Sequence, residues 1–364
     1  MGYGRRYRHR QFPGTRPAHP RRFRPRATRT CLVAELISAP TSVARLRLPP
    51  WPTTGPWRLL LRVVGRLGTL LVVLLVVFAT IDLLPGDGVR AALGRDATDA
   101  QVAAREAALG LDRPIPVRFG KWLAGLFSGD LGTSVRGTSV NEMLSTKFPN
   151  TLLLGGLALL VTAVTAVAFG ALWSFFPRSL PARVLSAATI AVIAIPEFVI
   201  AVCLVFVFAL VLGWLPAVTT TGPSGAPADA ASLLLPVVAL AIPQSGWNIR
   251  VTRSALDEAA QMPHVAAAEL DGLTRREIIL RHVLPIASPT IAASLATTVG
   301  MVLGGALVVE TIFNYPGVGA VLAGAVTDRD APVVAAVVAL TGVVITGLLI
   351  LADALRTWAV RGRA

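Results

Sequence analysis

The stretch HVAAAELDGLTRREIILRHVLP, residues 264–285, predicts two short helices joined at a glycine. Alanines at 266–268 favour a helix, and Gly272 can adopt the left-handed backbone that ends one. Thr274 and Glu277 have the spacing of a capping box, so a second helix is expected to start there. The pattern is typical of a docking loop, although a solvated linker fits it equally well.

The second helix and its exit carry further signals. Leu273, Leu280 and Leu284 are spaced to share one helical face. Pro285 and Pro289 both fit the first turn of the helix that follows. The loop is therefore expected to pack through one leucine face and to lead directly into another helix.

Apolar blocks dominate the chain on either side of this loop. The 364 residues are 54% hydrophobic and only 15% charged, whereas soluble domains carry about 25% charged residues. The predicted fold class is an all-α polytopic membrane protein with six transmembrane helices, each long enough for a core of about 30 Å. The first span is expected at 57–83, and a core at 150–360 carries the other five, at 150–175, 186–212, 232–250, 290–312 and 332–355.

Residues 84–149 form a polar insert between the first two spans and are predicted to be a small helical, extracytoplasmic cap. Thr98 and Gln101 have capping-box spacing, and the helix they start is expected to end at Gly110. Ser139 and Glu142 have the same spacing before the second span. Apolar residues at 115, 119, 122 and 126 predict an amphipathic helix that could lie on the bilayer.

Residues 1–56 differ sharply from the rest, because twelve Arg and one Glu account for most of the net charge of +14. Rich in Arg and Pro and without apolar periodicity, they are predicted to be a disordered cytoplasmic tail. An anionic-lipid or nucleic-acid patch, a topology signal and a misassigned start codon remain open. Because the tail has few aromatic residues for base stacking, no nucleic-acid partner is expected.

Arginine distribution predicts the orientation in the membrane. The loop at 213–231 has no Lys or Arg, and 313–331 has only Arg329. The positive-inside rule then places both termini and the loop at 251–289 in the cytoplasm. The arginines on that side include Arg178, Arg183, Arg250, Arg253, Arg275, Arg276, Arg281, Arg356, Arg361 and Arg363.

Catalytic and cofactor signals are missing from the sequence. A phosphate-binding Walker A loop needs a Gly-Lys-Ser/Thr run, and the two lysines, Lys121 and Lys147, do not fit it. Four scattered histidines form no Cys/His cluster of the metal-binding kind. We therefore expect a non-enzymatic subunit with no metal or cofactor of its own, driven by a partner.

The spacing of Ala267, Ala268, Gly272 and the Leu284-Pro285 pair resembles the EAA loop of the integral permeases of binding-protein-dependent ABC transporters. The resemblance implies that this loop couples the membrane subunit to an ATPase. Ala266 stands where the family has glutamate. Two positions that are often basic in the peptide subfamily are acidic here. The expected coupling residues are Ala267, Ala268, Glu269, Asp271, Gly272, Leu284 and Pro285.

Further stretches outside the loop narrow the resemblance to the first permease of dipeptide, oligopeptide and nickel ABC importers. They follow the family order from about residue 58 to 360. The stretches are LLPGD (83–87), ALGLDRPIPVRF (108–119), SGDLGTSV (128–135), IPEFV (195–199), GWLPA (213–217), TRSALDE (252–258), ETIFNYPGVG (310–319) and DALRTWAVRGR at the C-terminal end.

This resemblance implies a permease subunit in the lipid bilayer of a bacterial plasma membrane. It would form half of a translocation pathway, for which peptides are the expected cargo. It implies a second homologous permease, two cytoplasmic ATPases that hold ATP and Mg, and an extracytoplasmic substrate-binding lipoprotein as partners. A nickel chelate or another small solute is the alternative cargo. An ATPase-independent secondary transporter is the alternative from a different class, although we find no internal repeat of the kind common there.

Four polar residues in apolar surroundings are candidates for the pathway, because such groups usually face a partner, a cavity or a pore. Glu197 follows Pro196 in the third span, and Gln244 and Asn248 lie in the fourth. Glu310 opens ETIFNYPGVG, which by resemblance is a gate or re-entrant region. A structural hydrogen bond for Glu197, and a simple turn after Glu310, are the alternatives.

Overall fold

The computed structural model describes residues 56–361 except 83–87, 95–96 and 177–178. The predicted tail at 1–56 lies outside the described residues, apart from Pro56 at the start of the first helix. The described residues are mostly helical, with no strand and only two isolated bridges among them. The prediction of an all-α fold is confirmed.

Five of the described helices are long and apolar enough to cross a membrane, and a bent pair supplies the sixth candidate span. The chain is thus a multi-pass membrane protein. The five are α2 (Pro56–Asp82), α6 (Val140–Phe175), α9 (Ala231–Ala260), α12 (Leu284–Ile312) and α14 (Ala331–Arg361); the pair is α7 (Leu180–Ala194) with α8 (Glu197–Leu204), which continues as the π-helical η1 (Val205–Val211).

The third span is broken at Pro196, whereas the sequence predicted one span over 186–212. The helix axis bends by 108° between its two halves. Ile195 has extended backbone (φ −86°, ψ 126°) because Pro196 disfavours a helical residue before it. Pro196 also has no N–H for the preceding turn, so α8 starts afresh at Glu197.

Two spans extend well beyond their apolar blocks. α6 begins at Val140 rather than at 150, with Pro149 inside it. Buried Val140 and Leu144 hold this polar first part of the helix in the core. Ser139 makes no side-chain cap, so the second capping box was wrong. α9 likewise runs to Ala260, ten residues past its predicted end.

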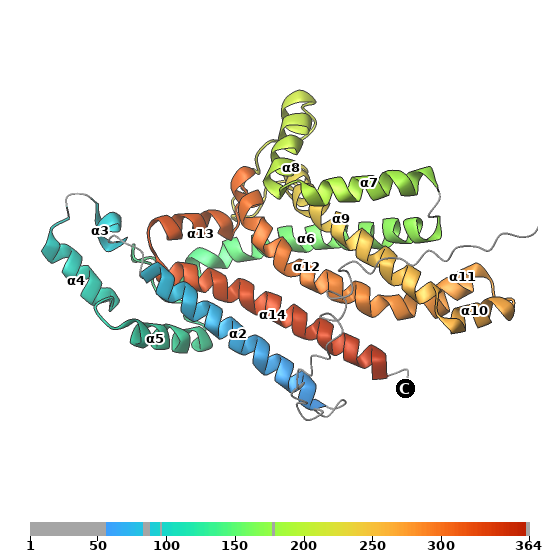
Figure 1. The fold of residues 1–364 in the computed structure, drawn as a ribbon. Helices are drawn as coiled ribbons and strands as arrows, with labels where there is room; N and C mark the ends of the chain where they lie inside the picture. Colours follow the sequence, from blue (N-terminus) through green and yellow to red (C-terminus); the bar gives the residue numbers. More distant parts are fainter. Residues whose placement is uncertain (1–55, 83–87, 95–96, 177–178, 362–364) are drawn as a thin grey trace, which may run out of the picture. The chain divides into compact units, whose positions relative to one another are not determined.

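α9 lies at the centre of the core and packs against α6, α7, α8 and α12. Its neighbours α6 and α12 also contact each other, and α14 packs on both α12 and α2 (Figure 1). Arg66 of α2 and Asp353 of α14 form an ion pair of 2.7 Å. The core helices are therefore joined by direct packing, and the first span is fastened chiefly to the last.

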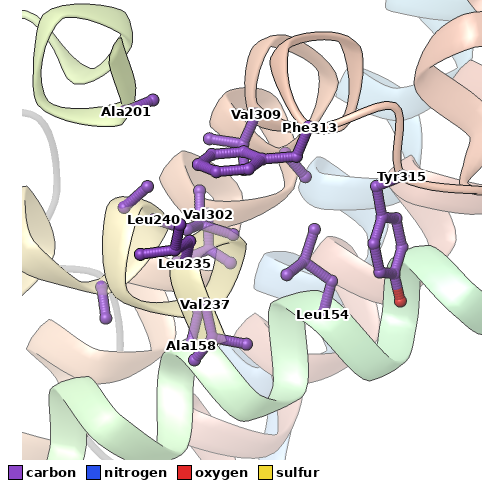
Figure 2. Close-up of a cluster of buried hydrophobic side chains, with 13 residues drawn as sticks. Leu154, Ala158, Ala201, Leu235, Val237, Leu240, Val302, Val309, Phe313 and Tyr315 are labelled. Carbon is purple, nitrogen blue, oxygen red and sulfur yellow. The ribbon is translucent and has the colours of Figure 1, made fainter. Parts of the chain in front are cut away.

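The largest buried apolar cluster joins α6, α9 and α12, with Ala201 of α8 at its edge. Figure 2 shows Leu154 of α6 beside the α9 and α12 side chains, and Phe313 and Tyr315 in the turn after α12. Tyr315 is only 2% exposed, and its hydroxyl donates to the Asn150 backbone oxygen at 2.7 Å. The cluster thus fixes the turn that follows α12.

The insert contains α3 (Gly88–Leu93), α4 (Asp99–Leu109) and α5 (Ile115–Ser128). The Thr98–Gln101 capping box is confirmed, as is the left-handed end at Gly110. The sequence predicted that the apolar face of α5 could lie on the bilayer. In the structure this face is not free to do so. Phe119 and Trp122 pack on Phe78 of α2, which gives that face a protein partner.

The loop between α5 and α6 is tied to the start of α14. Asp330 is 3% exposed and accepts hydrogen bonds from the Ser134 hydroxyl and the Val135 N–H. It also accepts from the Val333 N–H, as a cap on α14. Arg136 and Asp328 add an ion pair of 2.6 Å. The insert is therefore docked on the span ends and is not an independent domain.

Candidate functional site

The loop at 264–285 contains the two short helices joined at a glycine that the sequence predicts. α10 (Pro263–Leu270) ends before Gly272, whose φ of +77° reverses the chain. Thr274 and Glu277 form a complete capping box at the start of α11 (Arg275–Ile278). The π-helical η2 (Ile279–Val283) then runs into α12, so the loop is rigidly joined to a core helix.

The base of the loop is buried against the C-terminal end of α9, the end that the sequence predicts to lie on the cytoplasmic side. Val265 and Ala268 of α10 and Val283 of η2 pack with Leu256 and Ala259 of α9. Leu273 and Leu284 contact the same cluster, but Leu280 is 51% exposed, so the predicted three-leucine face was wrong at that position. A π-helical turn changes the spacing there, since it is wider than the α-helical turn that was assumed.

The tip of the loop projects away from this base. Ala267, Glu269, Asp271 and Gly272 are exposed there, whereas Ala268 is buried. Leu270 was missed from the sequence, yet it is the apolar side chain at the tip and is 89% exposed. Its position just before two turn residues was the available signal. At the base, Leu284 and Pro285 are half-buried, and Pro289 lies inside α12, not in its first turn as expected.

Arginines attach the loop to the end of α6. Arg275 donates to the Phe175 carbonyl oxygen at 3.0 Å, and its guanidinium lies 5.7 Å from the Phe176 ring centroid. Arg253 of α9 stacks on Trp173 at 4.2 Å and pairs with Asp257 at 3.2 Å. The loop is thus connected to α6, α9 and α12 together.

Glu197 stands at the first turn of α8, immediately after the bend, and not near the middle of a continuous helix. Its carboxylate lies against Gly305 of α12, where a Cβ would overlap it. Its Oε1 is buried and has no hydrogen-bond partner among the described residues. A half-buried carboxylate with an unused acceptor is able to bind a donor from outside the chain.

Asn248 joins α9 to α12 through hydrogen bonds. Its amide donates to Thr298 Oγ1 and to the Gln244 backbone oxygen, both at 2.8 Å. Ser294 Oγ donates to its side-chain oxygen, also at 2.8 Å. Asn248 is 1% exposed and Gln244 is also buried, so both lie between helices of this chain.

Glu310 is enclosed by the turn that follows it. Thr151 Oγ1 and the Gly319 N–H each donate to its carboxylate at 2.6 Å. The carboxylate also fills the space that a Cβ at Gly317 would occupy. Glu310 is 1% exposed. ETIFNYPGVG is therefore a closed polar turn between α12 and α13 (Val318–Thr327), held against α6.

The four pathway candidates are not brought together into one site. Asn248 and Glu310 already have hydrogen-bond partners inside the chain, and Gln244 lies beside Asn248. Glu197 alone among them has a buried oxygen without a partner in the part of the chain described. No group of three metal-ligating side chains occurs in the described ranges either.

Two known protein-family models match this chain. Residues 166–363 match the family model for the binding-protein-dependent transport system inner membrane component. Residues 57–155 match the model for the N-terminal part of such membrane components. The chain belongs to this family. It is therefore a permease subunit of an ABC transporter, and the loop at 264–285 lies inside the matched region.

Individual relatives cover most of this permease. It is 32% identical over 281 residues to the glutathione transport system permease protein of Pectobacterium atrosepticum, covering 77% of this chain and 89% of that protein. It is 30% identical to a protein named as a peptide permease in Brucella ovis, covering 80% and 94%. Among solved structures it is similar to the MetNI methionine ABC transporter, with 18% identity, a TM-score of 0.49, and 60% and 96% of the two chains covered.

Proposed function

We propose that this permease forms half of the translocation pathway of an ATP-driven importer for peptides. Family membership supports the importer class, and the names of the two relatives, for glutathione and for peptides, support the cargo. A second homologous permease, two ATPases that hold ATP and Mg, and a substrate-binding lipoprotein would complete the machine. ATP hydrolysis would then take place in the ATPases and not in this subunit.

One observation carries the coupling role: an exposed tip on a buried base. Leu270 projects between Glu269 and Asp271, while Val265 and Val283 fix the base in the core. An apolar anchor with charged neighbours is suited to a cleft on a partner protein. The proposed partner surface is the cytoplasmic ATPase.

This coupling requires the loop to lie in the cytoplasm. Arginines at 250, 253, 275, 276 and 281 gather at this end of the core, whereas the loop at 213–231 has none. The positive-inside rule supports cytoplasmic termini and an extracytoplasmic insert. The bacterial relatives support the bacterial plasma membrane as the location.

Movement at the tip would reach the membrane through covalent and packed connections. η2 continues into α12 without a break, and Arg275 ties α11 to α6. Closure of the ATPases on ATP would shift this rigid unit and change the access of the pathway between the two sides. Coupling then depends on the loop moving as one body.

Glu197 is the proposed pathway contact. A free peptide amino terminus is a cation with three N–H donors, which suits a carboxylate with an unused oxygen. Asn248, Gln244 and Glu310 would act by holding the helices that border the pathway. Glu197→Gln should raise the KM for a peptide with a free amino terminus and leave that for an N-acetylated peptide little changed.

The test is uptake by the assembled complex in proteoliposomes with a panel of labelled solutes. Accumulation of short peptides with ATP supports the proposal. Accumulation of a nickel chelate and not of peptides would support the alternative cargo by the same machinery. Uptake driven by an ion gradient without ATPase subunits would support a secondary transporter and contradict the proposal.

A further inference from the structure

A cleft of about 340 Å³ opens in the insert, apart from the coupling loop and the pathway candidates. Its walls come from the end of α4, from α5, and from the loop at 130–133. Phe78 of α2 and Pro332 of α14 also line it. Three segments far apart in the sequence therefore build one cavity on the docked insert.

Trp122 lines this cleft, and its indole N–H is buried without a hydrogen-bond partner among the described residues. The side chain is 8% exposed and is held between Phe78 and Phe119, with ring centroids 6.0 and 6.1 Å away. The Cδ1 edge of the indole, next to the N–H, lies towards Gly132, which lines the cleft too. Since a buried donor without a partner is costly, an acceptor is expected in the cleft.

The polar lining of the cleft is mostly cationic. Arg113, Arg118 and Lys121 line it against one acid, Asp130. The Asp130 side chain already accepts from the Gly132 N–H at 2.9 Å, and Arg118 lies 5.7 Å from the Phe78 ring centroid. Arg113 and Lys121 form no ion pair within the described part of the chain. The missing acceptor is therefore expected to be an anion.

The position of the cleft indicates what kind of anion it would bind. Phe78 lies in the last turn of the span Leu60–Ile81, and Pro332 is the second residue of the span Ala331–Ala354. The ends of two spans put the cleft at the depth of lipid headgroups. On the same helix α5, Val117 and Phe127 are 51% and 85% exposed, which provides apolar contact for acyl chains.

We propose that this cleft binds the phosphate headgroup of an anionic phospholipid from the leaflet on the side of the insert. Trp122 Nε1–H donates to a phosphate oxygen, and Arg113 and Lys121 supply the positive charge. Bound there, the lipid would bridge the insert and the outer turns of α2 and α14. The proposal rests on the chain being a membrane permease, but not on its cargo.

Native mass spectrometry of the assembled transporter in detergent tests this. The probes are phosphatidylglycerol, phosphatidylcholine and inorganic phosphate. Lys121→Gln and the double variant Arg113→Gln/Lys121→Gln remove charge from the cleft, and Trp122→Phe removes the donor but keeps an aromatic ring. Lys147→Gln is the matched control, because it removes the other lysine of the chain, which does not line the cleft.

We expect wild type to retain phosphatidylglycerol in preference to phosphatidylcholine. The double variant should lose this preference at least tenfold and Trp122→Phe several-fold, while Lys147→Gln keeps it. Equal binding of both lipids, or cleft variants that behave as wild type, would overturn the proposal. So would inorganic phosphate that competes as well as the lipid, or variants with normal lipid binding that fail only to recruit the substrate-binding protein.

Because ATP-dependent uptake is measured separately, its failure would count against the proposed function and not against the lipid site.

Discussion

Single residues decide the shape of the turn after α12. The Glu310 carboxylate takes hydrogen bonds from Thr151 and Gly319 and occupies the space beside two glycines. A buried carboxylate is tolerated when its acceptors are used in this way. Asn150 adds bonds from its amide to the Pro316 and Gly225 carbonyl oxygens. ETIFNYPGVG is thus a structural joint between α6, α12 and α13.

Gly319→Ala should destabilise this joint. A Cβ there would stand 2.7 Å from Glu310 Oε2 and 3.0 Å from the Leu307 carbonyl oxygen. Overpacking of this kind costs about 1–3 kcal/mol, which thermal unfolding of the purified complex would register as a lower transition temperature. Gly324→Ala on the same helix is the control, because its Cβ would meet nothing within 4 Å. Equal stability of the two variants would contradict the packing described.

At the scale of elements, features set by neighbouring residues could be predicted from the sequence, and features set by long-range packing could not. The capping boxes at Thr98 and Thr274 and the reversal at Gly272 depend on neighbours within four residues, so the sequence was enough to find them. The apolar stripe of α5 fits a bilayer or a protein equally well. Only the fold shows that Phe78 covers it.

The wrong predictions share one physical origin, because each concerns a feature that depends on contacts distant in the sequence. Ser139 fits a capping pattern, yet the adjacent Val140 N–H donates to the Gly132 carbonyl oxygen and no side-chain cap forms. The full break at Pro196 could not be told from a kink, because the bend angle depends on how α8 packs against α9 and α12. Among the pathway candidates, the partners of Glu310 lie more than 150 residues away or in the following turn.

Asp330 joins the loop between α5 and α6 to the start of α14, so its loss should release the loop from that helix. Asp330→Ala leaves the Ser134 hydroxyl and the Val135 N–H without their acceptor. Losing these buried bonds and a helix cap should cost about 2 kcal/mol or more. Hydrogen exchange should quicken over residues 128–139. Asp328→Ala, which breaks only the partly exposed pair with Arg136, should cost about 0–1 kcal/mol; a reversed order would refute the docking of the insert.

The coupling tip carries its own electrostatic prediction. Glu269 and Asp271 flank the exposed Leu270. If the ATPase cleft is basic to match, Glu269→Lys with Asp271→Lys should weaken copurification of the ATPase, most strongly at low salt, where screening is least. Arg276→Glu, in α11, is a control for a charge reversal elsewhere in the loop. Copurification unchanged at every salt concentration would show that both acids face water in the complex.

At the scale of the whole molecule, the orientation of the insert and the coupling loop can be read by labelling. Ser128 and Ser254 are both exposed in this chain, so cysteine at either position should react when reagent reaches it. In a background lacking Cys31 and Cys203, an impermeant maleimide applied to intact cells should label position 128 and not position 254. Labelling at 254 alone would mean that the topology is the reverse of the one proposed and that the loop cannot contact a cytoplasmic ATPase.

ATP-dependent peptide uptake with variants of Gly272 tests most directly whether this permease is driven through the 264–285 loop. Gly272 has a left-handed backbone but open space around it, so a substitution acts through conformation and not through a clash. In proteoliposomes holding the complete transporter, Gly272→Val should abolish uptake while ATP hydrolysis persists. Gly272→Asn, which tolerates this backbone, should retain uptake. Normal ATP-dependent uptake by Gly272→Val, or uptake by wild type without ATPases, would contradict the account.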